Sequence, residues 1–141
     1  MFVKTFQELS NEELYEILKI RSAVFVVEQN CVYLDIDGID PRAIHMYEKE
    51  DGEIVAYLRV FIAEEGVAQI GRVLTMKRSQ GYGKKVLEEG VRYAFEELHV
   101  NTIFVEAQVY AKAFYEKVGF EVCSQEFLED GIPHIKMELR K

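Results

Sequence analysis

Residues 73–83 join an apolar, β-branched segment to the most regular amphipathic helix of the chain, and they read Val73-Leu74-Thr75-Met76-Lys77-Arg78-Ser79-Gln80-Gly81-Tyr82-Gly83. Gly81 and Gly83 let the backbone turn tightly and bring its N–H groups close to a ligand. A helix that begins directly after them points its unpaired N–H groups and its positive dipole end at the same place. Arg78 adds a formal charge. The stretch therefore predicts a pyrophosphate site, and a glycine turn that only caps the helix is the alternative.

Charge is unevenly distributed along the chain. The sequence has 25 acidic and 17 basic residues, a net charge of −8. This balance disfavours nucleic-acid and anionic-membrane partners, which require a positive field. No acid occurs between Glu65 and Glu88, yet this window contains Arg72, Lys77, Arg78, Lys84 and Lys85. A locally basic segment in an acidic chain predicts an anionic ligand at the same place as the glycines.

Length and composition predict one domain over residues 1–141. The chain is 49% apolar and 30% charged, as is usual for globular proteins. It has no apolar run long enough to cross a membrane and no signal-peptide pattern at its start, so we expect a cytoplasmic protein. Cys31 and Cys123 lie in no metal-binding pattern, and no metal is expected.

Helical periodicity occurs three times. A capping box at Ser10 and Glu13 precedes apolar residues at helical spacing, which predicts a helix over about residues 11–25. The clearest amphipathic pattern follows Gly83 and extends to Leu98. A short helix is expected over residues 111–118, ended by a glycine in the position that a left-handed cap favours.

Alternating or β-branched segments predict the strands, which we expect at residues 2–6, 44–47, 54–62, 67–74, 102–107, 120–127 and 134–139. The last two form a hairpin around Asp130-Gly131. Gly71 lies inside a strand and indicates a bulge or the close approach of a ligand. The element order predicts an α/β protein of mixed α+β type, with a mixed, mostly antiparallel sheet of about six to seven strands flanked by helices on both faces.

A second pattern lies downstream, where the chain reads Glu106-Ala107-Gln108-Val109-Tyr110-Ala111-Lys112-Ala113-Phe114-Tyr115-Glu116-Lys117-Val118-Gly119-Phe120. This stretch resembles motif B of the GNAT superfamily of N-acetyltransferases, N-x-x-A-x-x-[hydrophobic]-Y-x-x-x-G-F, with Gln108 in place of the usual asparagine. Residues 73–83 resemble motif A of the same superfamily, with Ser79 where glycine is commoner. The resemblance implies the GNAT acyl-CoA N-acyltransferase fold and acetyl-CoA as co-substrate.

The resemblance also assigns residues to the cofactor. The loop N–H groups of GNAT proteins bind the pyrophosphate of coenzyme A, which implies a cofactor-binding set of Val73, Arg78, Ser79, Gln80, Gly81, Tyr82, Gly83 and Gln108. The motif B tyrosine lies near the thioester sulfur in that family, and Tyr115 matches it. A phenol is protonated at neutral pH and can donate to a departing thiolate. Packing in the core is the alternative role for Tyr115.

The likeness to one subgroup, the ElaA-type GNAT proteins, runs from end to end of the chain. It includes residues 26–31, the acidic stretch Asp35-x-Asp37-Gly38-x-Asp40, His45, residues 129–134 and Met137. The acidic stretch does not have the calcium-loop spacing. Its acids form either a solvated loop or the rim of a pocket for a cationic acceptor.

Three side chains are candidates on the acceptor side. Glu28 is expected to orient or deprotonate an amine, although an acid bonded to the backbone at a helix end would look the same. His134, and less so His45, are candidate bases because imidazole titrates near neutral pH. A satisfied structural histidine is the alternative for both.

Together these features predict an acetyl-CoA-dependent N-acetyltransferase that transfers the acetyl group directly to an amine. In this mechanism N–H groups near Val73 stabilise the oxyanion, Tyr115 is the general acid, and Glu28 and His134 act on the acceptor. The acceptor is a small-molecule or peptide amine, expected to be cationic, and a homodimer is left open. The competing interpretation is a non-catalytic module that binds and senses acyl-CoA.

Overall fold

The computed structural model describes residues 1–78 and 80–141 of the chain. They form one eight-stranded sheet in the order β1-β2-β3-β4-β5-β8-β6, with β7 paired to β8. The strands are β1 Phe2–Thr5, β2 Ile44–Glu50, β3 Glu53–Glu64, β4 Val67–Thr75, β5 Thr102–Gln108, β6 Glu121–Val122, β7 Phe127–Glu129 and β8 Ile132–Arg140. Every pair is antiparallel except β4 with β5. The mixed, mostly antiparallel sheet is confirmed.

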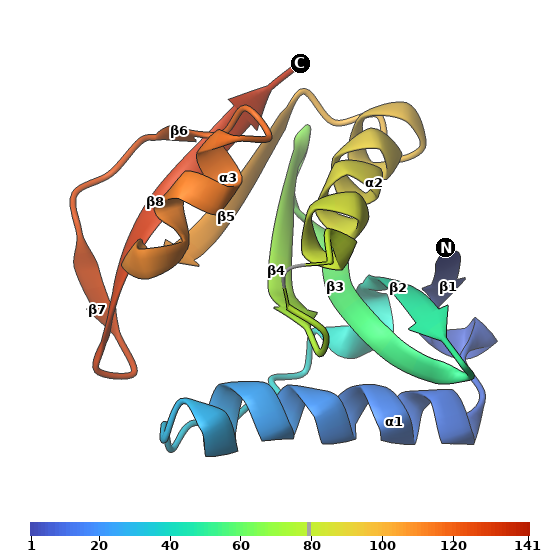
Figure 1. The fold of residues 1–141 in the computed structure, drawn as a ribbon. Coiled ribbons are helices and arrows are strands. Elements are labelled where there is room, and N and C mark those ends of the chain that lie inside the picture. Colours follow the sequence, from blue (N-terminus) through green and yellow to red (C-terminus); the bar gives the residue numbers. More distant parts are fainter. Residues whose placement is uncertain (79) are drawn as a thin grey trace.

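Helices cover both faces of the sheet (Figure 1). Helix α1, Asn11–Arg21, packs on one face through a cluster that includes Ile17, Tyr57 and Leu74. Helix α2, Tyr82–Glu96, and the short α3, Lys112–Glu116, pack on the other face, where the larger apolar core lies. The α2 core stripe approaches β3 so closely that a Cβ on Gly90 would lie 3.0 Å from Leu58.

Two elements differ from the sequence prediction. The first helix does not stop near residue 25, because a π-helical segment, Ser22–Glu28, continues α1. The strand expected over residues 120–127 is interrupted between β6 and β7. There the hydroxyl of Ser124 accepts from the Lys136 N–H at 2.9 Å, a bond that would otherwise join two strands through their backbones.

Strands β4 and β5 are hydrogen-bonded to each other over only part of their length. They pair only from Val67–Thr102 to Gln69–Phe104, although β4 continues to Thr75 and β5 to Gln108. Figure 1 shows the two strands converging at one end and diverging at the other. Beyond Gln69 and Phe104 the two strands are therefore no longer joined by backbone hydrogen bonds.

A β-bulge lies where β4 turns away from the sheet. Tyr57 is opposite Leu74 and Arg59 is opposite Gly71, so two β4 residues face the single residue Leu58. One of them, Arg72, has a φ of 52°, the left-handed region that a bulge residue occupies. The bulge expected from Gly71 is therefore present, one residue further along. A bulge leaves a backbone group outside the ladder and bends the strand, which accounts for the gap beside Val73.

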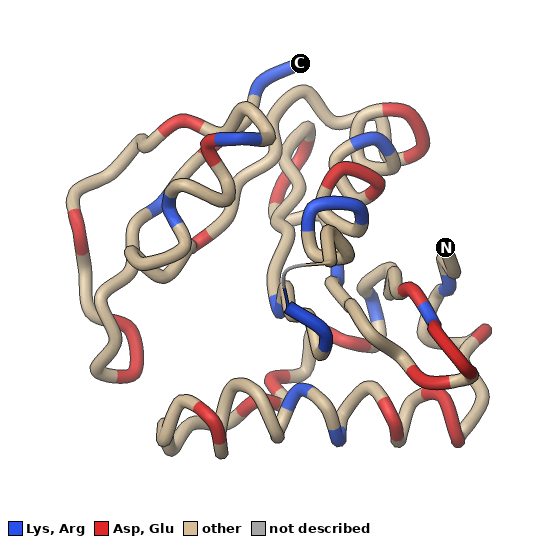
Figure 2. Tube along the Cα trace, in the orientation of Figure 1, with Lys and Arg blue, Asp and Glu red and all other residues tan. Residues whose placement is uncertain are grey.

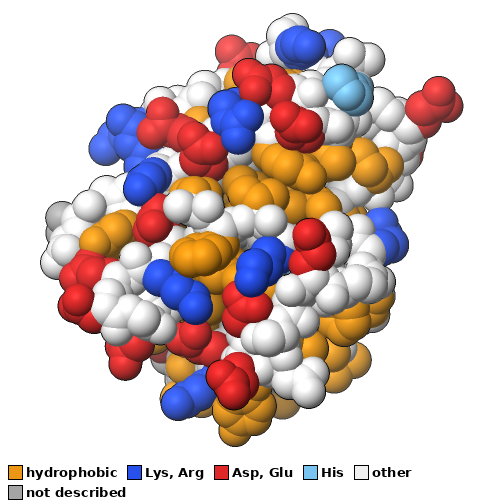
Figure 3. Space-filling model, turned by 90° about the vertical axis from the view of Figure 1, so that its right-hand side faces the viewer, with side chains coloured by type: hydrophobic (Ala, Val, Ile, Leu, Met, Phe, Trp, Pro, Cys, Tyr) orange, Lys and Arg blue, Asp and Glu red, His pale blue; other side chains and the backbone are white. Residues whose placement is uncertain are grey.

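The side of the molecule that carries β1 mixes both charge signs with apolar side chains (Figure 3). Its acids and bases pair at short range, as Lys4 does with Glu13 at 2.7 Å. No helix among residues 1–78 and 80–141 is long and apolar enough to cross a membrane.

Candidate active site

Two cavities meet at the gap between β4 and β5. One, of about 770 Å³, lies on the α3 side and reaches from Arg78 and Gly83 to Phe114 and Tyr115. We call it the cofactor-side cavity. The other, of about 460 Å³, reaches from Arg59 and Arg72 to Glu129 and His134, and we call it the acceptor-side cavity. Both are lined by Phe25, Gln29, Val73, Gln108 and Tyr115. Two reactants entering from opposite sides would meet there.

The predicted phosphate loop lies at the mouth of the cofactor-side cavity. Gly81 is the N-cap of α2 with a φ of 78°, a conformation that favours glycine, and no side chain caps the helix there. The first N–H groups of a fifteen-residue helix thus face this opening. Figure 2 shows Lys and Arg in the connection into α2 and in its first turn. This donor set fits a pyrophosphate.

The other loop residues that the sequence assigns to the cofactor differ in their exposure and in the partners that they already have. Ser79 lies outside the described residues, and Gln80 is exposed. Tyr82 supplies its N–H to the first turn, but its hydroxyl donates to Glu50. Arg78 reaches Glu28 with Nη2, so its charge is already paired before any anion binds.

Tyr115 lies where the two cavities join. Its ring packs edge-on against Phe114 at 5.2 Å and Phe120 at 5.9 Å, and its side chain is nine-tenths buried. Among the described residues its hydroxyl has no hydrogen-bond partner, yet it is not sealed from the cavity. Burial raises the pKa of Tyr115 above its ordinary value. The phenol therefore keeps its proton and offers it to whatever enters the gap.

Gln108 lies at the gap between β4 and β5, where its side-chain amide pairs with that of Gln29. Its Nε2 donates to Gln29 Oε1 at 3.0 Å, and Gln29 Nε2 returns a weaker contact of 3.4 Å to Gln108 Oε1. The pair links the end of β5 to the end of the π-helical segment. Gln108 therefore lies at the site that motif B predicts, with its amide engaged by the protein.

The acids of the stretch after residue 34 are paired with arginines, although Asp37 is exposed and lines the acceptor-side cavity. Asp35 and Asp40 are buried, and both bind the fully buried Arg21, at 3.0 and 2.7 Å. Arg59 binds Asp37 at 2.6 Å and Asp40 at 2.9 Å, and Arg72 binds Asp35 at 2.8 Å. Three carboxylates thus face three guanidinium groups. We call these six side chains the arginine–aspartate cluster. The burial of Asp35 and Asp40 contradicts a solvated loop at these two positions, whereas a role for Asp37 at the rim of a pocket for a cationic acceptor stays a prediction.

Glu28 and His45 lie away from the predicted acceptor position. Glu28 lines only the cofactor-side cavity, where it pairs with Arg78. His45 is fully buried, with Nδ1 2.6 Å from the Tyr57 hydroxyl and Nε2 3.0 Å from the Asp40 carbonyl. Burial lowers the pKa of His45, and the neutral ring is a satisfied structural group.

His134 does line the acceptor-side cavity, together with Tyr115. Its Nδ1 is 2.7 Å from the Ile132 carbonyl, which can only accept, so Nδ1 carries a proton. Nε2 lies 3.4 Å from Glu129 Oε2, a carboxylate oxygen that can only accept, so this contact is favourable when Nε2 also carries a proton. Phe127 stacks on the ring at 6.0 Å and fixes its orientation.

Two further acids at this position escaped the sequence interpretation. Glu106 and Glu129 line the acceptor-side cavity beside His134. A signal was present for Glu106, because on a strand it shares a face with Gln108, two residues on. Glu129 gave no such signal, because its position depends on the pairing of β7 with β8. No group of three or more His, Cys, Asp or Glu side chains suited to a metal gathers among the described residues.

Comparisons with known proteins agree with this arrangement. Residues 5–141 match the family model described as "Acetyltransferase (GNAT) domain". A UPF0039 protein of Schizosaccharomyces pombe is 40% identical over 140 residues, which cover 96% of this chain and 93% of that protein.

Two similar solved structures have nearly the same extent. The crystal structure of Escherichia coli ElaA superimposes with a TM-score of 0.92 at 33% identity, covering 99% of this chain and 98% of that one. An acyl-CoA N-acyltransferase from Pseudomonas aeruginosa gives a TM-score of 0.90 at 34% identity, with 97% of each chain covered. The splayed sheet, the helix N-terminus at its gap and these matches agree. The chain belongs to the GNAT acetyltransferase family and has the acyl-CoA N-acyltransferase fold.

Proposed function

We propose that this protein transfers an acetyl group from acetyl-CoA directly to an amine in a ternary complex. The observation that carries the proposal is the meeting of the two cavities at the gap between β4 and β5, with Tyr115 on the boundary. A thioester entering from the α3 side and an amine entering from the other side need no covalent enzyme intermediate. Cys31 is buried, and its thiol contacts only the Asp130 carbonyl at 3.6 Å, which leaves it without a base partner for a two-step route.

Separate groups of the protein would bind the pyrophosphate, the developing oxyanion and the sulfur of acetyl-CoA. The first turn of α2 and Arg78 would hold the pyrophosphate. A backbone N–H at the bulge beside Val73 would stabilise the oxyanion that develops when the amine attacks. The hydroxyl of Tyr115 donates to the sulfur as the C–S bond breaks.

Two variants test cofactor binding and the chemical step separately. Tyr115→Phe removes the donor and keeps the ring, so we expect kcat to fall about 100-fold with CoA affinity unchanged. Arg78→Ala should weaken CoA binding about tenfold, because it removes a guanidinium at the cavity that would exchange Glu28 for a phosphate. Arg92→Ala is the matched control, since that arginine lies on α2 but pairs only with Glu89 and Glu96.

The measurements are isothermal titration of CoA and thiol release during a screen of amine acceptors. CoA binding without thiol release for any amine would favour the alternative, a module that senses acyl-CoA. An unchanged kcat in Tyr115→Phe, with chemistry rate-limiting, would assign that tyrosine to packing.

A further inference from the structure

The end of the π-helical segment contacts both stretches of the chain that the sequence assigns to the cofactor. Glu28 pairs with Arg78 of the predicted phosphate loop. Gln29, the next residue and the C-cap of that segment, pairs with Gln108 of motif B. Segments of π-helix occur frequently at functional sites. The two motifs leave Gln29 without a role, although its side chain lines both cavities.

The side-chain amides of Gln29 and Gln108 fix each other's orientation. Gln108 Nε2 donates to Gln29 Oε1 at 3.0 Å, and Gln29 Nε2 lies 3.4 Å from Gln108 Oε1. Turning over one amide alone would place N–H against N–H and oxygen against oxygen, and neither contact is a hydrogen bond. Gln29 therefore determines which edge of the Gln108 amide carries the nitrogen.

The pairing leaves hydrogen-bonding capacity for a ligand. A primary amide nitrogen carries two N–H groups, and the reciprocal pair uses one from each residue. Neither side-chain amide has another protein partner among residues 1–78 and 80–141. Both residues are half-buried at the place where the two cavities join. The remaining N–H of Gln108 is thus oriented and unused in the cavity that would hold the cofactor.

The replacement of asparagine by glutamine in motif B explains why a partner is useful here. A glutamine side chain has one more rotatable bond than an asparagine side chain, and it loses more conformational entropy when a ligand orders it. A side chain that is ordered before the ligand arrives reduces this cost of binding. The bond to Gln29 orders Gln108 in the protein without a ligand.

We propose that Gln29 is a positioning residue, which holds the amide of Gln108 ready to donate to a carbonyl oxygen of the pantetheine arm of coenzyme A. The proposal rests on the cofactor binding and the acetyl transfer proposed above. In it, Gln108 contacts the cofactor, and Gln29 acts through Gln108. The resemblance to motif B assigns Gln108 to the cofactor but says nothing of Gln29.

Titration of CoA into four forms of the protein tests this coupling: the parent, Gln29→Met, Gln108→Met and the double variant. Methionine keeps the unbranched shape of glutamine but cannot form the amide pair. Gln29→Met should weaken CoA binding about threefold to tenfold, which is the cost of ordering one long side chain. Gln108→Met loses the donor itself, so its loss should be at least as large. The double variant should bind CoA as Gln108→Met does, because Gln29 then has nothing to orient.

Two outcomes of the titration overturn the proposal. One is a Gln29→Met variant that binds CoA as tightly as the parent. The other is a double variant whose loss of affinity is the product of the two single losses, since independent residues behave in this way. Gln125→Met is the matched control, because Gln125 is exposed and lines neither cavity, and it should bind CoA as the parent does.

A purely structural link between β5 and the helix end predicts a different set of results. It would lower the Tm of Gln29→Met and leave the Kd for CoA unchanged, and that result also overturns the proposal. In steady-state kinetics, positioning predicts a raised KM for acetyl-CoA, with kcat within about twofold of the parent value. A fall in kcat with an unchanged KM would place Gln29 in the chemical step instead and overturn its role in binding.

These outcomes distinguish the proposal from the proposed function. Coupled losses of CoA affinity in the absence of thiol release from any amine would support the role of Gln29 and refute the transferase. Thiol release from an amine with an unaffected Gln29→Met variant would support the transferase and refute the role of Gln29. A parent protein that does not bind CoA would refute both.

Discussion

The acceptor-side cavity lies between two groups of acids that have opposite electrostatic character. In the arginine–aspartate cluster, every carboxylate has a guanidinium partner within 3.0 Å. On the opposite wall, Glu106 and Glu129 act on each other's charge, with His134 3.4 Å from Glu129 and Lys136 opposite Glu106 in the β5–β8 register. The pKa values of Asp37 and Asp40 are lowered in the first group, whereas the pKa of Glu106 is raised in the second. Counting acids in a segment therefore does not reveal whether its charge is available to bind a substrate.

The largest expected effect comes from removing the central cation of the cluster. Arg21 is fully buried and donates to Asp35, to its carbonyl and to Asp40. Arg21→Met would leave two buried carboxylates short of a partner, which typically costs about 3–5 kcal/mol. Urea denaturation should show the loss. Arg21→Lys is the matched variant, since it keeps the charge but not the forked geometry. Its free energy of unfolding should lie between those of the parent protein and Arg21→Met. A loss below about 1 kcal/mol would mean that Arg59 and Arg72 neutralise the cluster alone.

A smaller effect with a pH signature is expected at Asp37. Burial by itself would raise its pKa, but the hydrogen bond from Arg59 and the charges of Arg59 and Arg72 lower it to about 2. A depressed pKa stabilises the folded state above the unfolded value of ~3.9, and this contribution is lost as the pH falls through about 2. Asp37→Asn should therefore destabilise by about 1–2 kcal/mol near neutral pH and by nothing near pH 2. Unfolding curves at several pH values would measure this, and a constant difference would contradict it.

The smallest expected effect has the opposite sign. The pKa of Glu106 is raised, first by burial and then by Glu129, so its ionisation costs stability as the pH rises through that value. Glu106→Gln should raise Tm slightly at neutral pH and above, and it should have no such effect in acidic solution, where the parent carboxyl is protonated in both the folded and the unfolded state. A lower Tm at neutral pH would show that Glu106 already has a partner and would remove the contrast between the two walls.

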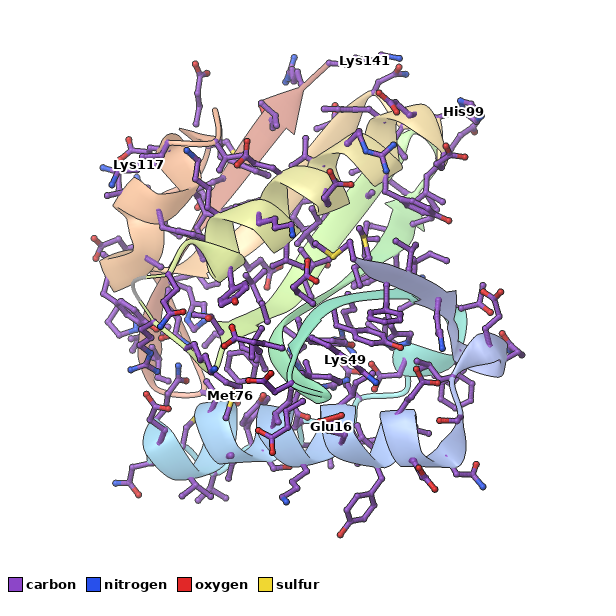
Figure 4. All side chains as sticks on the ribbon, turned by 45° about the vertical axis from the view of Figure 1, so that its right-hand side comes forward. Glu16, Lys49, Met76, His99, Lys117 and Lys141 are labelled. Atoms are coloured by element: carbon purple, nitrogen blue, oxygen red, sulfur yellow. The ribbon has the colours of Figure 1, made fainter. Side chains whose placement is uncertain are left out.

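Helix α1 offers an internal reference for these stability measurements, because its paired acids lie outside both cavities. Figure 4 shows Glu16 on the helix next to the β2–β3 turn, where its Oε2 accepts from the Ile54 N–H at 3.2 Å. Glu13 is a second reference, since its contacts with Lys4, Tyr47 and Ser10 lower its pKa to about 2. Glu13 thus behaves as the acids of the arginine–aspartate cluster do.

The sequence by itself determined the periodic elements and the two motifs. The strand, loop and helix around residues 73–83 follow from local rules, since glycines turn, helices expose N–H groups at their start, and side chains alternate along strands. For the same reason Tyr115 and Gln108 were identified through a motif of fixed spacing, and both line the two cavities that meet at the gap between β4 and β5. The family and the fold needed nothing more.

Only the tertiary structure decided which charges are neutralised and which remain free. The three aspartates of residues 35–40 looked available because their partners, Arg21, Arg59 and Arg72, come from three other segments of the chain. Glu129 received no site role from the sequence, because its contact with His134 requires the β7–β8 pairing. Glu106 comes close to both residues only through the pairing of β5 with β8. Coulomb interactions depend on distance in space, and sequence separation does not set that distance. Residues close together in the sequence therefore predicted the proposed cofactor side, whereas the charges on the proposed acceptor side depend on contacts that only the folded chain makes.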